Sequence, residues 1–281
     1  MTAGHCVYDP ESNVWSSEVI FIPGYHEGKA PYGVWEAENL YTSEGWIESA
    51  EDDLPYSAYD FGMLLLKPKG GRYIQERLGA LGVAFNQPRQ QVYTEYGYPG
   101  EPLPYNGEKL WSLTSPLVGT DPYYSPHPIE INSDFGPGTS GGPFIVEPAG
   151  EVDSVATYRY DDEPSRIFGT YFGNDIEGLY CNLAGLSYEQ LEQYQHEGLA
   201  YMQWAVPCDG TLKVSGPKIL TAARTENAFS GNLWIPVKPR WQTAAHLERV
   251  HRINARVNLD FKPIVGEAIR EWVNVELVDR G

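Results

Sequence analysis

The loop at residues 134–143 has the composition that a nucleophilic serine requires. It reads Asp-Phe-Gly-Pro-Gly-Thr-Ser-Gly-Gly-Pro, so that Ser140 lies among Gly138, Gly141 and Gly142. A serine hydroxyl becomes a nucleophile when a neighbouring base accepts its proton, and the oxyanion formed by its attack needs uncovered backbone N–H groups. Glycines leave the backbone uncovered. The same composition is also typical of a surface turn, so the loop alone leaves both interpretations open.

One histidine and one aspartate have contexts that suit the partners of such a serine. The chain has six histidines, namely His5, His26, His127, His196, His246 and His251. His5 lies in Thr-Ala-Gly-His-Cys, a turn of small residues that would place the imidazole at a strand end. An imidazole base needs a carboxylate that sets its tautomer and stabilises the imidazolium. Asp60 heads the apolar run 61–66, which would hold it rigidly as part of a buried strand.

The elements that must position these residues are predicted to be short strands. Aromatic residues make up 13% of the chain, which also contains 29 glycines and 22 prolines, and this composition favours strands joined by turns. Apolar runs separated by turn residues occur at 18–22, 59–66, 91–98, 109–113, 129–131 and 144–146. This spacing predicts an all-β barrel or sandwich up to about residue 180.

The composition changes after about residue 180. Ser187-Tyr188-Glu189-Gln190 predicts a capping box that opens a helix closed by Gly198. A second helical pattern has an apolar face formed by Leu247, Val250, Ile253 or Asn254, and Val257. Residues 200–206 and 272–277 are predicted strands. We therefore expect an α+β extension, in which we find no motif that carries chemistry.

Taken together, the three motifs resemble a known family. Thr-Ala-Gly-His-Cys, then Tyr-Asp-Phe-Gly, then Gly-Thr-Ser-Gly-Gly-Pro follow one another as in the trypsin-like (chymotrypsin-fold) serine peptidases, whose triad runs His, Asp, Ser. Further segments are similar to the V8-like or glutamyl-endopeptidase-like branch, at 21–25, 30–35, 97–101 with Trp111, 133–143 and 168–173. The resemblance covers about residues 1–180.

The resemblance implies two six-stranded antiparallel β-barrels. Residues 1–86 would form the first lobe with the His and Asp, residues 87–180 the second lobe with the nucleophile loop, and residues 181–281 an extension. In this family the catalytic histidine follows two or more strands, whereas four residues precede His5 here. We therefore expect an incomplete first barrel and an N-terminally truncated sequence.

The resemblance also assigns roles to individual residues. Ser140 would be the nucleophile, His5 the general base and Asp60 its orienting acid, with the N–H groups of Gly138 and Ser140 as the oxyanion hole. Asp134 and Thr157 would bind substrate.

Asp134 falls at the floor of the family's specificity pocket, where an acid could attract a basic side chain. An aspartate that hydrogen-bonds its own turn is an equal alternative. Thr157 would lie on the strand that pairs with the substrate backbone. Thr139 stands where many animal enzymes carry an aspartate that receives the new N-terminus on activation, so we do not expect that activation route.

The charge and the cysteines limit the partners and the compartment. A formal net charge of −18 argues against nucleic acids or anionic membranes as partners, because phosphate binding needs clustered Lys and Arg. We expect a protein or peptide substrate, a monomer, and neither a cofactor nor a metal ion. Three cysteines allow one disulfide and one leftover thiol, or three thiols in a reducing compartment. The resemblance implies a Cys181–Cys208 disulfide, an unpaired Cys6 and a secreted protein, although the sequence lacks a signal segment.

Two other functions remain open. A catalytically silent or fragmentary homologue could act as a binding module. An acidic lipase or esterase would also place glycines two residues before and after its serine, as Gly138 and Gly142 do. That motif requires a following helix, whereas Pro143 and a β run follow here.

Overall fold

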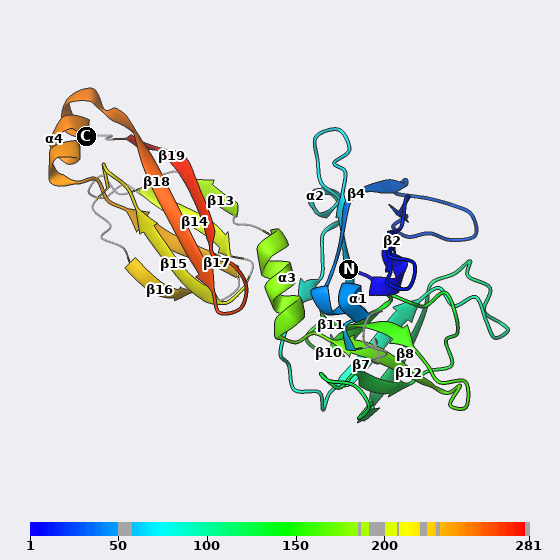
Figure 1. The fold of residues 1–281 in the computed structure, drawn as a ribbon. Helices are drawn as coiled ribbons and strands as arrows, with labels where there is room; N and C mark the ends of the chain where they lie inside the picture. The colour runs from blue at the N-terminus through cyan, green and yellow to red at the C-terminus, as the bar shows by residue number, and fades with distance from the viewer. Residues whose placement is uncertain are drawn as a thin grey trace. The chain divides into compact units, whose positions relative to one another are not determined.

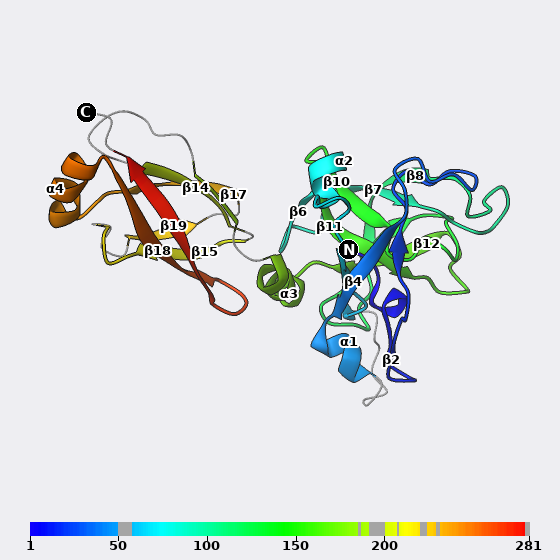
Figure 2. The ribbon, with the colours of Figure 1, turned by 90° about the horizontal axis from the view of Figure 1, so that it is seen from above.

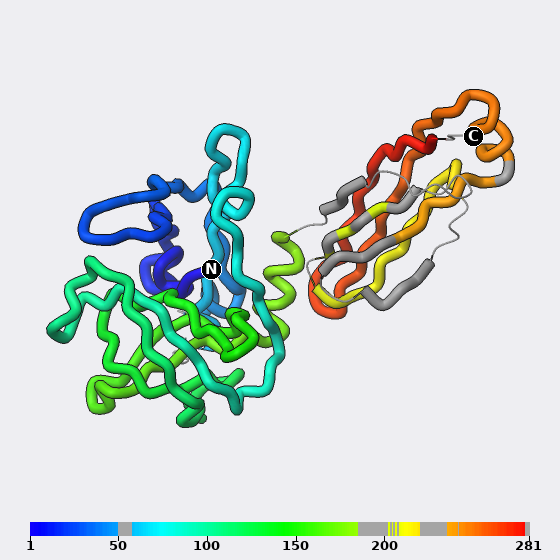
Figure 3. Tube along the Cα trace, turned by 180° about the vertical axis from the view of Figure 1, so that it is seen from behind, coloured from blue at the N-terminus to red at the C-terminus, as the bar shows by residue number. Residues whose placement is uncertain are grey.

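The structure is a computed structural model, and it describes residues 1–49, 58–184, 187–190, 200–206, 208–219, 224–228 and 231–278. The chain forms two compact units, Met1–Ile176 and Glu177–Gly281 (Figures 1 and 3).

A closed antiparallel barrel of six strands forms the second half of the first unit. Its strands are β7 (Val92–Gly97), β8 (Trp111–Thr120), β9 (Ile129–Asn132), β10 (Pro143–Glu147), β11 (Glu151–Tyr158) and β12 (Arg166–Tyr171). They follow the order β10-β7-β8-β9-β12-β11, and the pairing of β10 with β11 closes the barrel. Closure leaves no free edge among these strands. A short seventh strand, β6 (Gly82–Val83), pairs in parallel with β11.

Inward-facing apolar side chains fill the barrel. The core contains Tyr93, Ile129, Ile131, Phe144, Val146, Ala156 and Ile167. Ile129 and Ile131 are fully buried and alternate along β9 with more exposed residues, as expected for a strand with one buried face. The all-β barrel predicted for this region is confirmed.

The N-terminal part of the first unit contains an open sheet. Strands β3 (Ile20–Phe21), β4 (Trp35–Thr42) and β5 (Gly62–Leu66) form a three-stranded antiparallel sheet, beside the hairpin of β1 (Tyr8–Asp9) and β2 (Val14–Trp15). The helical elements are η1 (Gly4–Cys6), α1 (Glu44–Glu48) and α2 (Gln75–Leu78). Figure 2 shows these elements and the barrel strands within one unit. Within the described residues the strands of this lobe do not close into a barrel.

Two sheets pack together in the second unit. One consists of β13 (Ser187–Gln190), β14 (Ala200–Val206) and β17 (Gly231–Val237), and the other has the order β16 (Arg224–Ala228), β15 (Gly210–Ser215), β18 (Arg252–Pro263) and β19 (Ile269–Val278). A single core joins them, in which Met202 and Ile235 from the first sheet pack with Leu212 and Val275 from the second. Among the residues that the structure describes here, the helices are α3 (Asn174–Ala184), which begins before this unit, and α4 (Trp241–Val250).

The two helices predicted in this unit differ from the observed elements. Residues 187–190 form strand β13 rather than the start of a helix, and Gly198 lies outside the described residues. Helix α4 ends at Val250, because His251 adopts a left-handed φ of 58°, and Ile253 and Val257 lie on strand β18. Positions four residues apart share a face of both a helix and a strand, which made the pattern ambiguous. The strands predicted at 200–206 and 272–277 are confirmed as β14 and part of β19.

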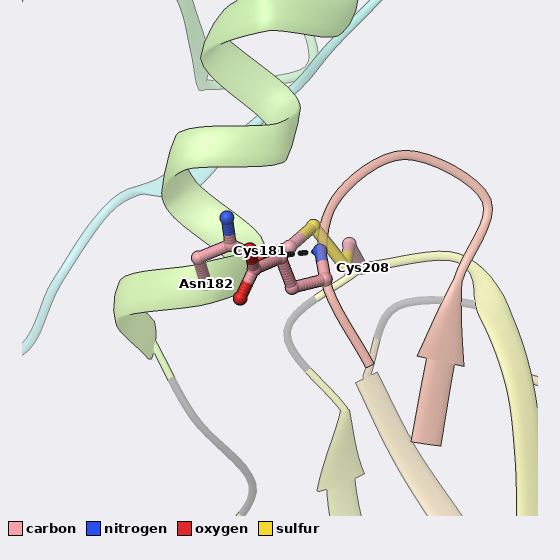
Figure 4. The surroundings of a disulfide bond; sticks show 4 residues. Cys181, Asn182 and Cys208 are labelled. Carbon is pink, nitrogen blue, oxygen red and sulfur yellow. Dashed lines mark hydrogen bonds between the residues drawn. A yellow bond between two sulfur atoms is a disulfide. The ribbon is translucent and has the colours of Figure 1, made fainter. Parts of the chain in front are cut away.

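A disulfide joins Cys181 of α3 to Cys208, just before β15 (Figure 4). Next to it, Asn182 Oδ1 accepts a hydrogen bond of 2.7 Å from the backbone N–H of Glu267 in the β18–β19 turn. The Cys181–Cys208 pairing is therefore confirmed. Cys6 is a free, half-buried thiol.

Candidate active site

Asp60 holds His5 by two hydrogen bonds. The backbone N–H of His5 donates to Asp60 Oδ1 over 2.8 Å, and His5 Nδ1 lies 2.7 Å from Asp60 Oδ2. A carboxylate can only accept here, so Nδ1 carries the proton and Nε2 is left free to accept one. Asp60 is only 5% exposed, whereas the His5 side chain is 38% exposed. The pair thus combines a buried carboxylate with a partly exposed imidazole.

Backbone contacts fix the segments that carry the two residues. Thr2 and Gly62 exchange two backbone hydrogen bonds of 2.9 and 2.8 Å, which join the His5 turn to β5. Thr170 of β12 donates its hydroxyl to the Asp60 carbonyl over 3.0 Å, which ties the pair to the barrel. A Cβ on Gly4 would come within 2.9 Å of Phe61 N, so a glycine is required where this turn meets the Asp60 strand.

The electrostatics of the pair favour a protonated imidazole. Burial lowers the pKa of His5, but hydrogen bonds and charge from Asp60, with a smaller contribution from Cys6, outweigh burial and raise this pKa to about 10. A stabilised imidazolium is what a base needs after it has accepted a serine proton.

The loop that carries Ser140 connects β9 to β10 and lies against the His5 segment. Gly141 has a left-handed φ of 78°, and a Cβ at this position would come within 2.9 Å of Ala3 N. Gly141 N donates to the Ala156 carbonyl, and Ala156 N donates to the Gly142 carbonyl, each over 2.8 Å. The nucleophile loop is therefore anchored to β11 and touches the residues that precede His5.

Two backbone N–H groups of the loop donate no hydrogen bond within the described residues. Thr139 N donates to Gly136 O over 3.3 Å, and Gly142 N donates to Thr139 O over 2.8 Å. Among the hydrogen bonds of the described residues, none uses the N–H of Gly138 or of Ser140 as donor. These are the two donors expected for the oxyanion hole.

Ser140 itself is half-buried, and its hydroxyl has no hydrogen-bond partner within the part of the chain that the structure describes. The structure thus joins His5 to Asp60 by hydrogen bonds but does not join Ser140 to His5. Catalytic hydrogen bonds are often long without substrate and shorten in the substrate complex.

Of the two predicted substrate-binding residues, Asp134 lies at the start of this loop and Thr157 lies on β11. Asp134 is exposed, and its Oδ1 accepts a hydrogen bond of 2.9 Å from the Tyr105 hydroxyl. Thr157 is buried, and its hydroxyl donates to the Phe168 carbonyl over 3.1 Å. The register of β11 with β12 shifts between Ala156 and Tyr158, which places Thr157 at a bulge.

The sequence analysis missed Glu95, which lies beneath the loop. This residue of β7 is 0% exposed, and its Oε1 accepts a hydrogen bond of 3.1 Å from the hydroxyl of Thr139, the residue before Ser140. Burial raises the pKa of Glu95 to about 7, and the nearby hydroxyls of Ser133 and Thr139 lower it less. An acid in the middle of a strand that is otherwise aromatic and polar was the available signal.

Within the described residues, His, Cys, Asp and Glu nowhere gather in groups of three or more that could hold a metal ion. Every helix within the described residues is too short or too polar to cross a membrane.

Comparison with known proteins gives the chain its family. No family model matches it. The protease Anisep from Arthrobacter nicotinovorans, known from a crystal structure, shares 32% sequence identity with this chain. The two structures match with a TM-score of 0.57 over 64% of this chain and 80% of Anisep. The thermostable serine protease AL20 from an extremophilic microorganism is 36% identical with a TM-score of 0.55, over 62% of this chain and 78% of that one. The chain belongs to the V8-like branch of the chymotrypsin-fold serine peptidases.

Two more distant relatives of this V8-like chain are glutamyl endopeptidases. A glutamyl endopeptidase from Bacillus licheniformis is 24% identical over 148 residues, which is 52% of this chain and 42% of that protein. The chain therefore spans less than half the length of that curated relative. A solved Glu endopeptidase, 20% identical with a TM-score of 0.51 over 62% of this chain and 75% of that one, shares the fold.

Proposed function

We propose that this V8-like chain is a serine endopeptidase that hydrolyses peptide bonds through an acyl-enzyme on Ser140. The observation that carries the proposal is the pair of hydrogen bonds that Asp60 accepts from His5, next to a glycine-rich loop with two unused N–H donors. The kinship with two proteases of more than 30% identity supports it.

In the acylation step, His5 Nε2 accepts the Ser140 proton as the serine oxygen attacks the substrate carbonyl carbon. Asp60 stabilises the imidazolium that results, and the N–H groups of Gly138 and Ser140 bind the oxyanion. His5 then donates its proton to the leaving amine, and the C–N bond breaks. In deacylation a water molecule gives a proton to His5 as its oxygen attacks the acyl carbon. His5 then returns a proton to the Ser140 oxygen as the ester C–O bond breaks, which releases the acid product and restores the free serine.

The substrate would lie along β11 and the nucleophile loop. We place its backbone beside Thr157, where the bulge interrupts the β11–β12 ladder, and its side chain toward Asp134. This placement is tested by measuring kcat/KM of the wild type and of Asp134→Asn on peptides that differ only at the residue before the cleaved bond. We expect a loss confined to Lys and Arg substrates, whereas an equal loss for every peptide would argue against contact with Asp134.

A secreted peptidase fits the Cys181–Cys208 disulfide, because disulfides persist in oxidising compartments. We propose a protein or peptide as substrate and a monomer as the working form.

Labelling with a fluorophosphonate probe, together with burst release from an activated ester, tests the function. We expect the probe on Ser140 and one burst equivalent per chain, both lost in Ser140→Ala. Ser112→Ala is the matched control, because Ser112 is an exposed serine on β8 of the same barrel. A wild-type chain with neither labelling nor burst would instead be a silent homologue that acts by binding.

A further inference from the structure

Glu95 and Thr139 form a contact between the barrel core and the nucleophile loop. Thr139 is buried and packs on the face of β7 that carries Glu95 and, two residues on, Gly97. A Cβ on Gly97 would come within 3.2 Å of the Thr139 Cβ, so the glycine makes room for Thr139. The residue before the predicted nucleophile is thus seated over a fully buried carboxyl group.

The segment that follows β7 also holds the loop, through backbone hydrogen bonds. Gly100 N donates to the Pro137 carbonyl over 2.7 Å, and Gly136 N donates to the Glu101 carbonyl over 3.0 Å. These bonds fix the start of the loop. Among the described residues from Gly136 to Ser140, Thr139 is the one whose side chain forms a hydrogen bond with the barrel core.

We propose that Glu95 is a positioning residue of the nucleophile loop, which acts through Thr139 to hold the peptide units of Gly138 and Ser140 in place for the oxyanion. This inference rests on the proposed function. It adds a residue that touches neither the substrate nor the reacting atoms.

The surroundings of Glu95 make this contact dependent on protonation. The titratable groups that face it are Asp134 in the loop, whose charge further raises the Glu95 pKa, and Tyr105, whose hydroxyl binds Asp134. Its partners across the ladder are uncharged, Leu113 on β8 and Phe144 on β10. Loss of the Glu95 proton would therefore bury a charge without an opposing cation, and we expect the loop to loosen as pH rises through about 7.

Matched variants test the positioning role. Thr139→Val removes the donor at constant shape, and its control is Thr94→Val, a buried threonine of β7 whose hydroxyl binds Thr114 and Glu147. We expect Thr139→Val to lower kcat by about 10- to 100-fold with little change in KM, since small misplacements act on the transition state. Thr94→Val should retain the wild-type kcat.

A second pair of variants tests protonation. Glu95→Gln keeps an acceptor for Thr139 but cannot ionise, and its control is Asp153→Asn, which removes another buried acid of the barrel, on β11. The ratio of the Glu95→Gln kcat to the wild-type kcat should rise as pH passes 7, while the Asp153→Asn ratio stays flat. Equal ratios for the two variants, or a wild-type kcat in Thr139→Val, would overturn the proposal.

Hydrogen exchange separates this proposal from the catalytic one. Amides 134–142 should exchange faster in Thr139→Val than in Thr94→Val, whether or not the wild type reacts with the fluorophosphonate. A wild type that does not react would refute the peptidase function alone. Unchanged exchange in Thr139→Val would refute the role of Glu95 alone.

Discussion

Asp60 binds both the backbone N–H and the ring Nδ1 of His5, at 2.8 and 2.7 Å, although the two residues are 55 positions apart. One carboxylate therefore fixes both the position of the turn and the orientation of the imidazole. Asp60 is buried and His5 is partly exposed, and in the proposed mechanism the proton from Ser140 goes to Nε2, the ring nitrogen that Asp60 does not bind.

The pH profile of Asp60→Asn tests this relationship. His5 acts as a base only when unprotonated, and its raised pKa puts the rising limb of kcat/KM well above pH 6.5 in the wild type. Without the carboxylate the limb should move to lower pH, and kcat should fall by roughly 10⁴-fold because the imidazole loses its orienting partner. A limb at the same pH in both proteins would show that Asp60 does not control His5.

Gly141→Ala tests the approach of the two predicted catalytic segments. An alanine methyl would meet the backbone of Ala3 within 2.9 Å, and the residue would have to keep a φ of 78°. We expect a loss of stability of about 1–3 kcal/mol and a large loss of labelling at Ser140. Gly150→Ala is the control, because Gly150 has a similar φ of 75° with open space at its Cβ. If both variants lose labelling equally, backbone conformation alone explains the effect.

Asp153→Asn tests a buried acid outside the site. Asp153 is 1% exposed, neither of its carboxylate oxygens has a partner among the described residues, and burial raises its pKa to about 7. A folded-state pKa above the unfolded value means that stability is lost as pH rises from the unfolded pKa near 3.8 to the folded pKa of about 7, and that it stays constant above that pH. Asn cannot ionise, so we expect the variant to be more stable than the wild type by about 1–3 kcal/mol at pH 8, with a much smaller gain at pH 4. Urea unfolding at both pH values measures the difference, and a gain that does not depend on pH would contradict a titrating Asp153.

Removal of the Cys181–Cys208 disulfide by mutation tests how much this bond stabilises the second unit. The bond closes a loop with a sequence separation of 27 residues, for which chain entropy predicts a contribution of about 3–4 kcal/mol. Cys181→Ser with Cys208→Ser should therefore lower the melting temperature of the residues 177–281. Labelling of Ser140, which lies in the first unit, should be unchanged. Cys6→Ser serves as the control that leaves the disulfide intact.

Much of this protein is determined by local sequence. The glycines around Ser140, the small residues before His5 and the acid at the head of β5 are short motifs. Turns and strand ends favour particular residue types, so such motifs can be recognised from a few neighbouring residues. For the same reason the barrel strands β7, β8, β9 and β10 and the strands β14 and β19 could be predicted from apolar runs between turns, whereas β11 and β12 could not.

Only the tertiary structure decided the features that join distant segments. Barrel closure through β10 and β11, the bonds from Asp60 to His5 and the contact of Glu95 with Thr139 each join residues that are far apart in sequence or depend on which face of a strand is buried. Residues Ile253 and Val257 show the limit, because their spacing fits a helix and a strand equally well until β18 pairs with β15 and β19. Periodicity specifies which residues share a face, and packing against partners specifies what that face meets.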